Sequence, residues 1–360
     1  MTYLLQPTHS VHYPATATPI NDGRAMSARK PARVDFACGI ARVRTMSPTD
    51  AEMVSGWIAR EFPLPSSLAA DLPALLVRLI SEETLGGVVA EHIEDTSRQP
   101  AVVGFGISGF LNEACVLEYL AAPYPHLELD LLDRCRCGRS RSTFLDYDAI
   151  AQGNAREGLT LFPLMWLQRT TDPADPESRA LLTLGQQTFL RIHRGYRLNR
   201  ILKEARADRA EGYVNGGFRE RCLLPAGMAL RFPGMKLERD HIVFEVTKSQ
   251  VEATMPGIAV GHLFSYRRPR CGFSRAEKQV LSWAADGLTD AQIARQLGIG
   301  TAAVALRWRS IYARIANRSP AALQEDRPQP NTRGRGQEKR RRVLAFLNDY
   351  PEEMRPYLSP

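Results

Sequence analysis

The sequence lacks the features that mark membrane-bound or secreted proteins. No run of 18 or more apolar residues occurs among its 360 residues, so no transmembrane helix and no membrane partner are expected. Residues 1–30 lack the basic start, apolar middle and cleavage site of a signal peptide, and we interpret them as a mobile tail. Cysteines are few, only six, and we expect them to be reduced thiols in a cytoplasm.

Motifs for metal binding and catalysis are also scarce. The seven histidines show no paired spacing such as H-E-x-x-H, so we predict no metal ligand, catalytic residue or cofactor. Cys135 and Cys137 lie among arginines, which lower the pKa of a thiol and favour its oxidation, but a zinc site would need two more ligands. We interpret both as ordinary loop thiols. His193, two residues before Gly195, is expected to be a helix cap or a surface group, with ligand contact as the alternative.

Three glycines give a superficial G-x-G-x-x-G pattern, namely Gly104, Gly106 and Gly109. A dinucleotide-binding loop would also require a following helix and an acidic partner for the ribose, and neither is convincingly present. Glycines within a strand instead allow a close approach of neighbouring backbone. We therefore favour strand glycines over a nucleotide site.

Charge is unevenly distributed along the chain. From Arg267 onward there are 18 lysines and arginines against 9 aspartates and glutamates, whereas the preceding residues carry 29 against 30. A nearly neutral large domain followed by a small basic one favours a polyanionic partner for the second. A solvated basic tail is the alternative, and charge alone does not decide between them.

Helical and strand patterns alternate over residues 31–266, which predicts a mixed α+β or α/β domain. The expected order is a strand, two helices, two strands around a polar turn at 94–100, a helix, a strand, a helix and a strand. This order resembles the acetyltransferase-type (GNAT-like) fold. That family binds the pyrophosphate of acetyl-CoA with a Gln/Arg-x-x-Gly-x-Gly/Ala loop. The nearest segment here, 134–141, has one glycine at the wrong spacing.

Two capping boxes introduce a helical block after Phe273. The spacing of a capping box occurs twice, at Ser274 with Glu277 and at Thr289 with Gln292. In a capping box, the first side chain accepts the backbone N–H of the second residue, and the second side chain accepts the backbone N–H of the first. The second helix is short and ends in the glycine-containing turn LGIG, after which a longer third helix begins. Two short helices, a glycine turn and a longer helix form the helix-turn-helix pattern.

The third helix has one apolar and one small-residue face. At 100° per residue, Val304, Trp308, Ile311 and Ile315 form a stripe that we expect to be buried. The opposite face carries small residues together with Leu306 and Arg309. Arg309 is the candidate for a bidentate contact to guanine, and Leu306 for contact with a thymine methyl. Residues that flank the stripe, and that we expect near phosphates, are Arg307, Ser310 and Arg314.

This segment resembles the LuxR-type (GerE-like) helix-turn-helix of bacterial transcription regulators. The resemblance implies a scaffold helix at 290–297 and a recognition helix at 301–315. Gly300, Ala303 and Ala305 stand where the family usually has Ser, Thr and Lys, which puts the usual contact set in doubt. The matching residues are Glu277, Val280, Leu281, Gly287, Leu288, Ile293, Ala294, Leu297, Ile299, Val304, Ile311 and Ile315.

A linker at 321–335 and a basic helix at 336–360 follow the motif at 271–320. Val343, Phe346, Leu347 and Tyr350 are expected to pack on the third helix. Positive charges crowd the first turns, although a helix N-terminus favours negative groups, so a DNA-binding role is the simpler explanation. The further residues that we predict to contact DNA are Arg333, Arg335, Lys339, Arg340, Arg341 and Arg342.

These patterns predict a cytoplasmic bacterial transcription regulator. Its amino-terminal domain, 31–266, would sense a small-molecule or protein signal, and its helix-turn-helix would enter the major groove of double-stranded DNA. A homodimer is expected, with RNA polymerase as a further candidate partner. Two alternatives remain open: an acyltransferase-like enzyme with a helix-turn-helix appendage, and a protein-interaction module. No receiver-domain aspartate pattern supports control by phosphorelay.

Overall fold

The computed structural model describes residues 33–36, 39–93, 100–172, 174–253, 259–323 and 335–358. The predicted tail at 1–30, nearly all of the turn at 94–100 and most of the linker at 321–335, including Arg333, lie outside the described residues. None of the helices in the described part combines the length and hydropathy that a membrane span requires.

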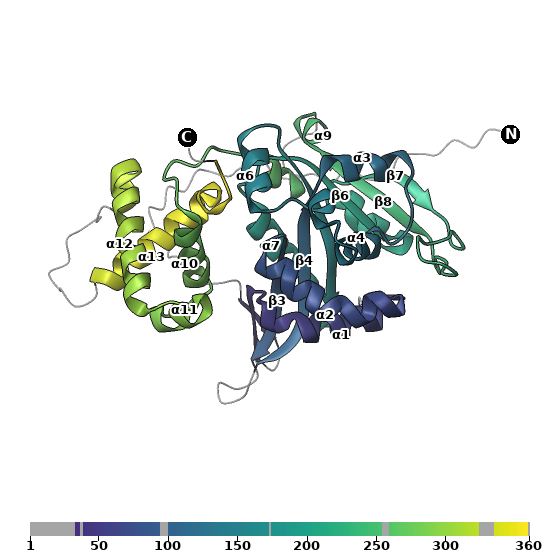
Figure 1. The fold of residues 1–360 in the computed structure, drawn as a ribbon, viewed down its shortest axis with the longest axis horizontal. Helices are drawn as coiled ribbons and strands as arrows, with labels where there is room; N and C mark the ends of the chain where they lie inside the picture. The colour runs from purple at the N-terminus through teal and green to yellow at the C-terminus, as the bar shows by residue number, and fades with distance from the viewer. Residues whose placement is uncertain are drawn as a thin grey trace, which may run out of the picture.

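One mixed sheet of eight strands organises the larger part of the molecule (Figure 1). Its strand order is β1-β2-β3-β4-β5-β6-β8-β7, and every neighbouring pair is antiparallel except β5 with β6. The strands are β1 (Arg33–Phe36), β2 (Gly39–Thr45), β3 (Leu85–Ile93), β4 (Ala101–Leu111), β5 (Leu159–Gln168), β6 (Leu198–Arg206), β7 (Arg219–Leu224) and β8 (His241–Thr247).

The parallel pair opens after its first few residues. β5 and β6 pair from Leu159 with Leu198 to Leu161 with Ile201. Both strands continue beyond this point, but their described residues do not pair further with each other. Beyond that point the side chain of Lys203 bridges the gap, because its Nζ donates to the carbonyl oxygens of Pro163 and Leu164 at 3.1 and 2.9 Å. The sheet therefore contains a cleft between two neighbouring strands.

Glycines on β4 allow the sheet to pack closely, as predicted. A Cβ on Gly106 would lie 2.9 Å from Cε3 of Trp166, and one on Gly104 would lie 3.0 Å from the carbonyl oxygen of Leu167. All three predicted glycines lie inside the strand, so they form no nucleotide-binding loop.

Helices cover both faces of the sheet. On one face, α1 (Ala51–Glu61), α2 (Ser66–Ser81) and α4 (Leu127–Arg136) contribute to the largest apolar core. On the other, Leu181 and Leu184 of α7 (Pro176–His193) pack on residues of β2, β3 and β4. Shorter segments complete this domain: η1 (Pro48–Asp50), α3 (Glu113–Ala121), α5 (Ser140–Thr143), α6 (Tyr147–Ala155), η2 (Ala207–Arg209), α8 (Ala210–Asn215), α9 (Lys248–Glu252) and η3 (Ala259–Phe264).

The prediction for Cys135 was wrong, and so was the surface alternative for His193. Cys135 is a buried residue of α4 rather than a loop thiol, and burial raises its pKa to about 11 instead of the predicted lowering. His193 is buried rather than on the surface, at the end of α7, where its Nε2 lies 2.7 Å from the Ser108 hydroxyl. Burial lowers the pKa of His193 to about 3, so the ring is neutral at physiological pH.

The carboxyl-terminal helices share a second core. They are α10 (Arg275–Ala285), α11 (Asp290–Leu297), α12 (Thr301–Arg318) and α13 (Arg335–Asp349), with η4 (Pro320–Leu323) and η5 (Pro351–Met354). Both predicted capping boxes are present, at Ser274 with Glu277 and at Thr289 with Gln292. Val343, Phe346 and Leu347 of α13 lie in the same core as the stripe of α12, which confirms their predicted packing.

Candidate nucleic-acid interface and the cavity of the sheet domain

The helix-turn-helix places one face of α12 in the core and leaves the other exposed. Val304, Ile311 and Ile315 are fully buried, and Trp308 is buried with its Nε1 donating to Oδ1 of Asp290 at 3.2 Å. The left-handed backbone of Gly298, at φ 62°, closes the turn between α11 and α12. The predicted buried stripe is therefore confirmed.

The exposed face of α12 carries Leu306 and Arg309 among small residues, and the exposed Ser310 lies at its edge, where its hydroxyl is hydrogen-bonded to Glu277 of α10. Leu306 is 57% exposed, which is unusual for a leucine in the middle of a helix. Within the described part of the chain, Arg309 has no hydrogen-bond or ion-pair partner. Figure 1 shows α12 on the side of the helical group that is farther from the sheet. This face is open to a macromolecular partner.

Arg307 and Arg314 lie on the side of α12 that faces α10. Arg314 donates to Glu277 at 3.1 Å and to the carbonyl oxygen of Gly272 at 3.0 Å, and Arg307 approaches the carbonyl oxygen of Ala276 at 3.5 Å. Burial opposes ionisation of Glu277, but hydrogen bonds from Ser310 and Ser274 and the charge of Arg314 hold its pKa below the ordinary value. Both arginines, which the sequence places near phosphates, therefore also have partners within the protein.

The basic cluster of α13 divides into structural and exposed residues. Arg340 donates to Oδ1 of Asp290 at 2.8 Å and to the carbonyl oxygen of Leu288 at 2.7 Å, with its guanidinium 4.9 Å from the Trp308 ring. It therefore fastens α13 to the start of α11. Arg341 and Arg342 pair with Glu338, and Lys339 lies 4.6 Å above the ring of Tyr312. Arg335 begins α13, and its side chain lies outside the described residues.

Polar contacts join α10 to the sheet domain. Oδ2 of Asp286 accepts the main-chain N–H of Thr45 at 3.0 Å, and burial raises the pKa of this carboxyl. Oε1 of Glu83 accepts from Arg275 and Gln279 at 3.2 and 3.1 Å. Charged and polar groups dominate these contacts, as in interfaces between domains that can move.

The segment after α13 forms a second connection between the two domains. Arg355 donates to the carbonyl oxygens of Arg194 and Arg191, at the end of α7, at 2.8 and 3.4 Å. The carbonyl oxygen of Arg355 in turn accepts from Nζ of Lys278 on α10. Burial lowers the pKa of Lys278 to about 8. One residue thus links α7 of the sheet domain to α10, the first of the carboxyl-terminal helices.

A cavity of about 970 Å³ opens where β5 and β6 separate. Its volume is at the upper end of the range typical of small-molecule sites. Aromatic and cationic side chains contribute to its wall, and one side is formed by α7. Its lining includes Trp166, Phe189, His193, Lys203 and Arg206.

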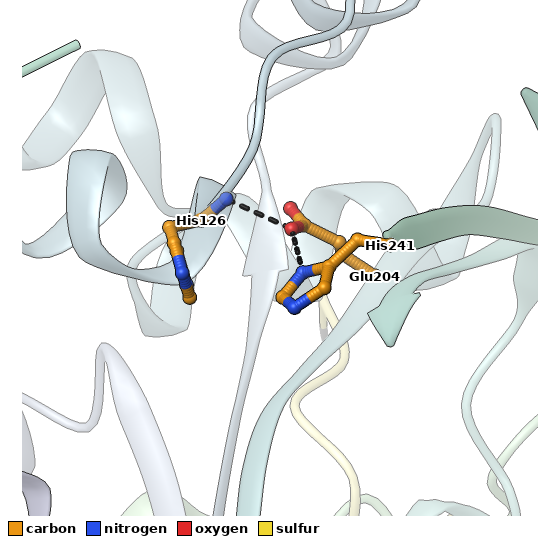
Figure 2. Close-up of side chains that lie close together, drawn as sticks. All are labelled: His126, Glu204 and His241. Atoms are coloured by element: carbon orange, nitrogen blue, oxygen red, sulfur yellow. Dashed lines mark hydrogen bonds and ion pairs between the residues drawn. The ribbon is translucent and has the colours of Figure 1, made fainter. Parts of the chain in front are cut away.

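His126, Glu204 and His241 converge at the wall of this cavity (Figure 2), and Glu128 lies beside His126. Glu204 on β6 accepts the main-chain N–H of His126 at 2.8 Å and Nδ1 of His241 at 2.7 Å. Nδ1 of His126 lies 3.0 Å from Oε1 of Glu128. Burial opposes protonation of His126, but Glu128 holds the pKa of His126 above its ordinary value and is itself held below its own.

Sequence reasoning missed this cluster, because its members are far apart in the chain. His126 precedes α4, whereas Glu204 and His241 lie on the neighbouring strands β6 and β8. No local spacing connects them, and only the pairing of β6 with β8 brings the last two together. The available signal was His241 at the start of the mostly apolar strand β8, whereas Glu204 lies among several other polar residues of β6.

Comparison with known families identifies the helical block. Residues 272–323 match the family described as GerE, "Bacterial regulatory proteins, luxR family", so this part of the chain is a LuxR-type helix-turn-helix domain. The predicted resemblance is confirmed. No curated protein matches the chain.

The sheet domain has low-level similarity to solved acetyltransferases. Spermidine/spermine N-acetyltransferase SpeG from Vibrio cholerae shares 10% identity over 58% of this chain and 95% of its own, with a TM-score of 0.33. NAA60 from Arabidopsis thaliana, in complex with acetyl-CoA, shares 15% identity over 57% of this chain and 98% of its own, with a TM-score of 0.32. Similarity at this level assigns no activity to the chain.

Proposed function

We propose that this chain is a transcription regulator in which the cavity of the sheet domain senses a ligand and α12 reads duplex DNA. The observation that carries the DNA-binding part is the exposed face of α12, with Leu306, Arg309 and Ser310, inside a LuxR-type domain. An arginine at the centre of such a face suits bidentate contact with guanine in the major groove. Arg341 and Lys339 supply charge toward the DNA backbone from α13.

The sensing part of the proposal is supported by the route from the cavity to α10. Phe189 and His193 of α7 line the cavity, and the carbonyl oxygens that accept from Arg355 lie at the end of the same helix. Arg355 is hydrogen-bonded to Lys278 on α10. A ligand that shifts the end of α7 would therefore shift the attachment of the helix-turn-helix. Differential affinity of the ligand for the two arrangements would supply the energy for regulation.

We further propose two domains, a sheet domain within 31–266 and a helical domain from 267 to the end. Small residues at Ala302, Ala303 and Ala305 leave few groups on α12 that read bases. Modest discrimination by one copy would be compensated by a homodimer on two half-sites about one helical turn apart. The proposed location is the cytoplasm of a bacterium, where DNA and RNA polymerase are accessible.

Selection of bound fragments from random-sequence duplexes tests this function. The full chain should enrich a defined motif, and the Arg309→Ala variant should lose the preference at one base pair of it. Arg139→Ala, which removes an exposed arginine of the sheet domain, is the matched control and should enrich the same motif as the unaltered chain. Enrichment of no motif by any of the three proteins would contradict the proposed function.

A further inference from the structure

We propose that His126, Glu204 and His241 form a binding site for one divalent transition-metal ion at the wall of the cavity. One candidate ligand atom from each of the three side chains lies within 4.8 Å of those of the other two. Figure 2 shows the His241 ring and the main-chain nitrogen of His126 at the Glu204 carboxylate, and the centroids of the two imidazole rings lie 5.0 Å apart. The inference is separate from DNA binding, since it concerns a site in the sheet domain.

The first argument is the concentration of buried negative charge. The Glu204 side chain is 1% exposed, and Glu128, beside it in the cavity wall, is also buried. The nearby Lys203 donates to main-chain carbonyl oxygens. Glu128 has the His126 ring as its partner, whereas Glu204 accepts the uncharged main-chain N–H groups of His126 and Leu127, at 2.8 and 3.0 Å, besides Nδ1 of His241. A buried carboxylate is stabilised further when a cation compensates its charge. A divalent ion between the imidazoles would supply that compensation.

The second argument comes from polar atoms without partners. Within the described residues, Oε2 of Glu128 and the hydroxyl of Tyr119 are buried and have no hydrogen-bond partner. Burial raises the pKa of the Tyr119 hydroxyl, and the negative charges of Glu204 and Glu128 raise it further. Buried unpartnered polar atoms are rare in native structures and call for an explanation such as an ion with its bound water. Glu128 lines the cavity and is hydrogen-bonded to His126, so a water on an ion bound by His126 is the partner that we infer for its Oε2.

The third argument is the way in which the imidazoles are held. His126 has a left-handed backbone, at φ 58°, which is uncommon for a residue other than glycine, and its ring packs edge-to-face on the ring of His241 at 5.0 Å between centroids. Its Nδ1 is oriented by Glu128, which leaves Nε2 as the atom available to an ion. A carboxylate that orients a histidine in this way is the usual outer partner of a metal ligand.

Binding of the metal ion requires small side-chain rotations and the transfer of one proton within the His241 ring. Metal–ligand bonds of about 2.0–2.2 Å place ligand atoms roughly 3.4 Å apart, so side-chain rotations must widen the contact between Glu204 and His241 and close the longest separation. A neutral imidazole carries one N–H. Transfer of that proton from Nδ1 to Nε2 of His241 frees a lone pair that faces Glu204, with no net change in protonation.

The ligand set favours zinc among the common ions. Imidazole nitrogen suits Zn²⁺ and neighbouring late transition metals, whereas Ca²⁺ requires six to eight oxygen ligands. With three protein ligands, the fourth position of a tetrahedral Zn²⁺ would face the cavity. A molecule with a carboxylate or a phenolate group could then bind the ion directly.

The test is metal uptake by the full chain after treatment with a chelator. Calorimetric titration with Zn²⁺ alone should show one site per chain, and titration with Ca²⁺ should show none. His241→Asn keeps an N–H donor for Glu204 but removes the ligand lone pair, and should weaken Zn²⁺ binding at least 100-fold. Glu128→Gln should weaken it about 10- to 100-fold, as expected for an outer partner.

The control is His262→Asn, which alters an exposed histidine of η3 and should leave the Zn²⁺ affinity unchanged. Far-ultraviolet circular dichroism of the metal-free variants checks that each one is folded. If a variant is unfolded, His126→Gln replaces it in the same titration. Absence of stoichiometric uptake, or uptake that His241→Asn and His262→Asn reduce equally, would overturn the metal site and leave DNA binding untouched.

Discussion

Acidification should destabilise this protein through His193. The ring is buried at the end of α7, with Nε2 2.7 Å from the Ser108 hydroxyl and Nδ1 2.9 Å from the carbonyl oxygen of Phe189. Burial lowers its pKa to about 3 in the folded chain, whereas the pKa in the unfolded chain is about 6.5. Between these values the unfolded chain binds the extra proton, so stability is complete above pH 6.5 and is lost as the pH falls.

The size of the effect follows from linkage. At pH 5 the unfolded ring is protonated and the folded ring is not, which costs about 2 kcal/mol of the free energy of unfolding relative to pH 7.5. Urea unfolding of the full chain at both pH values measures this loss. Other groups also contribute to the pH dependence of stability, so the informative quantity is the difference between the unaltered chain and a variant without the ring.

His193→Gln is the appropriate variant, because its amide can still bond to Ser108 but does not titrate. The unaltered chain should lose about 2 kcal/mol more than the variant between pH 7.5 and pH 5. An equal loss in both proteins would refute the reasoning, since it would mean that His193 is protonated in the fold or accessible to water. Calorimetry at pH 5 would also show whether the loss falls on the sheet domain, as its position requires.

Further predictions concern the helical domain and its attachment. Trp308→Ala should cost about 3–5 kcal/mol and unfold this domain in a thermal melt, because it truncates a buried tryptophan; a normal melt would mean that the ring is not in the core. Arg340→Ala should lower stability by about 1 kcal/mol through the lost ring and ion-pair contacts, while the salt dependence of DNA binding stays constant. Lys339→Ala should instead weaken binding to all DNA sequences alike and reduce the slope of log K against log salt by about one unit. Arg355→Ala should separate the unfolding of the two domains into two calorimetric transitions, and a single unchanged transition would exclude its linking role.

The helical domain could be predicted because its signals are local. The capping boxes at Ser274 and Thr289 and the stripe from Val304 to Ile315 depend on residues three or four positions apart, and all are present in the structure. Burial of α13 against this core also followed from its apolar spacing. The sequence could not predict which arginines have structural partners. Arg340, for example, pairs with Asp290, which lies 50 positions away in the chain.

The sheet domain was predictable only in outline. Strands of high apolar content, such as β5 and β8, were recognised, whereas β7 and α4 were missed. Their residues carry many charges that fold back onto partners elsewhere, as Arg134 does with Glu118. The arginines around Cys135 suggested a reactive thiol, but α4 turns that thiol into the core, where desolvation outweighs their charge. In both examples, contacts between residues distant in the sequence determine the structure, and local patterns do not show them.

The central claim is that α12 reads duplex DNA with help from the exposed cations of the helical domain. Its most direct test is the affinity of the full chain for its selected duplex, measured over a range of salt concentrations with the unaltered chain and Arg309→Ala. If about five phosphates are neutralised, log K should fall with log salt at a slope of roughly −4 to −5, and Arg309→Ala should relax one base-pair preference by about 1–3 kcal/mol. A slope near zero, with no base-pair preference altered, would contradict the account.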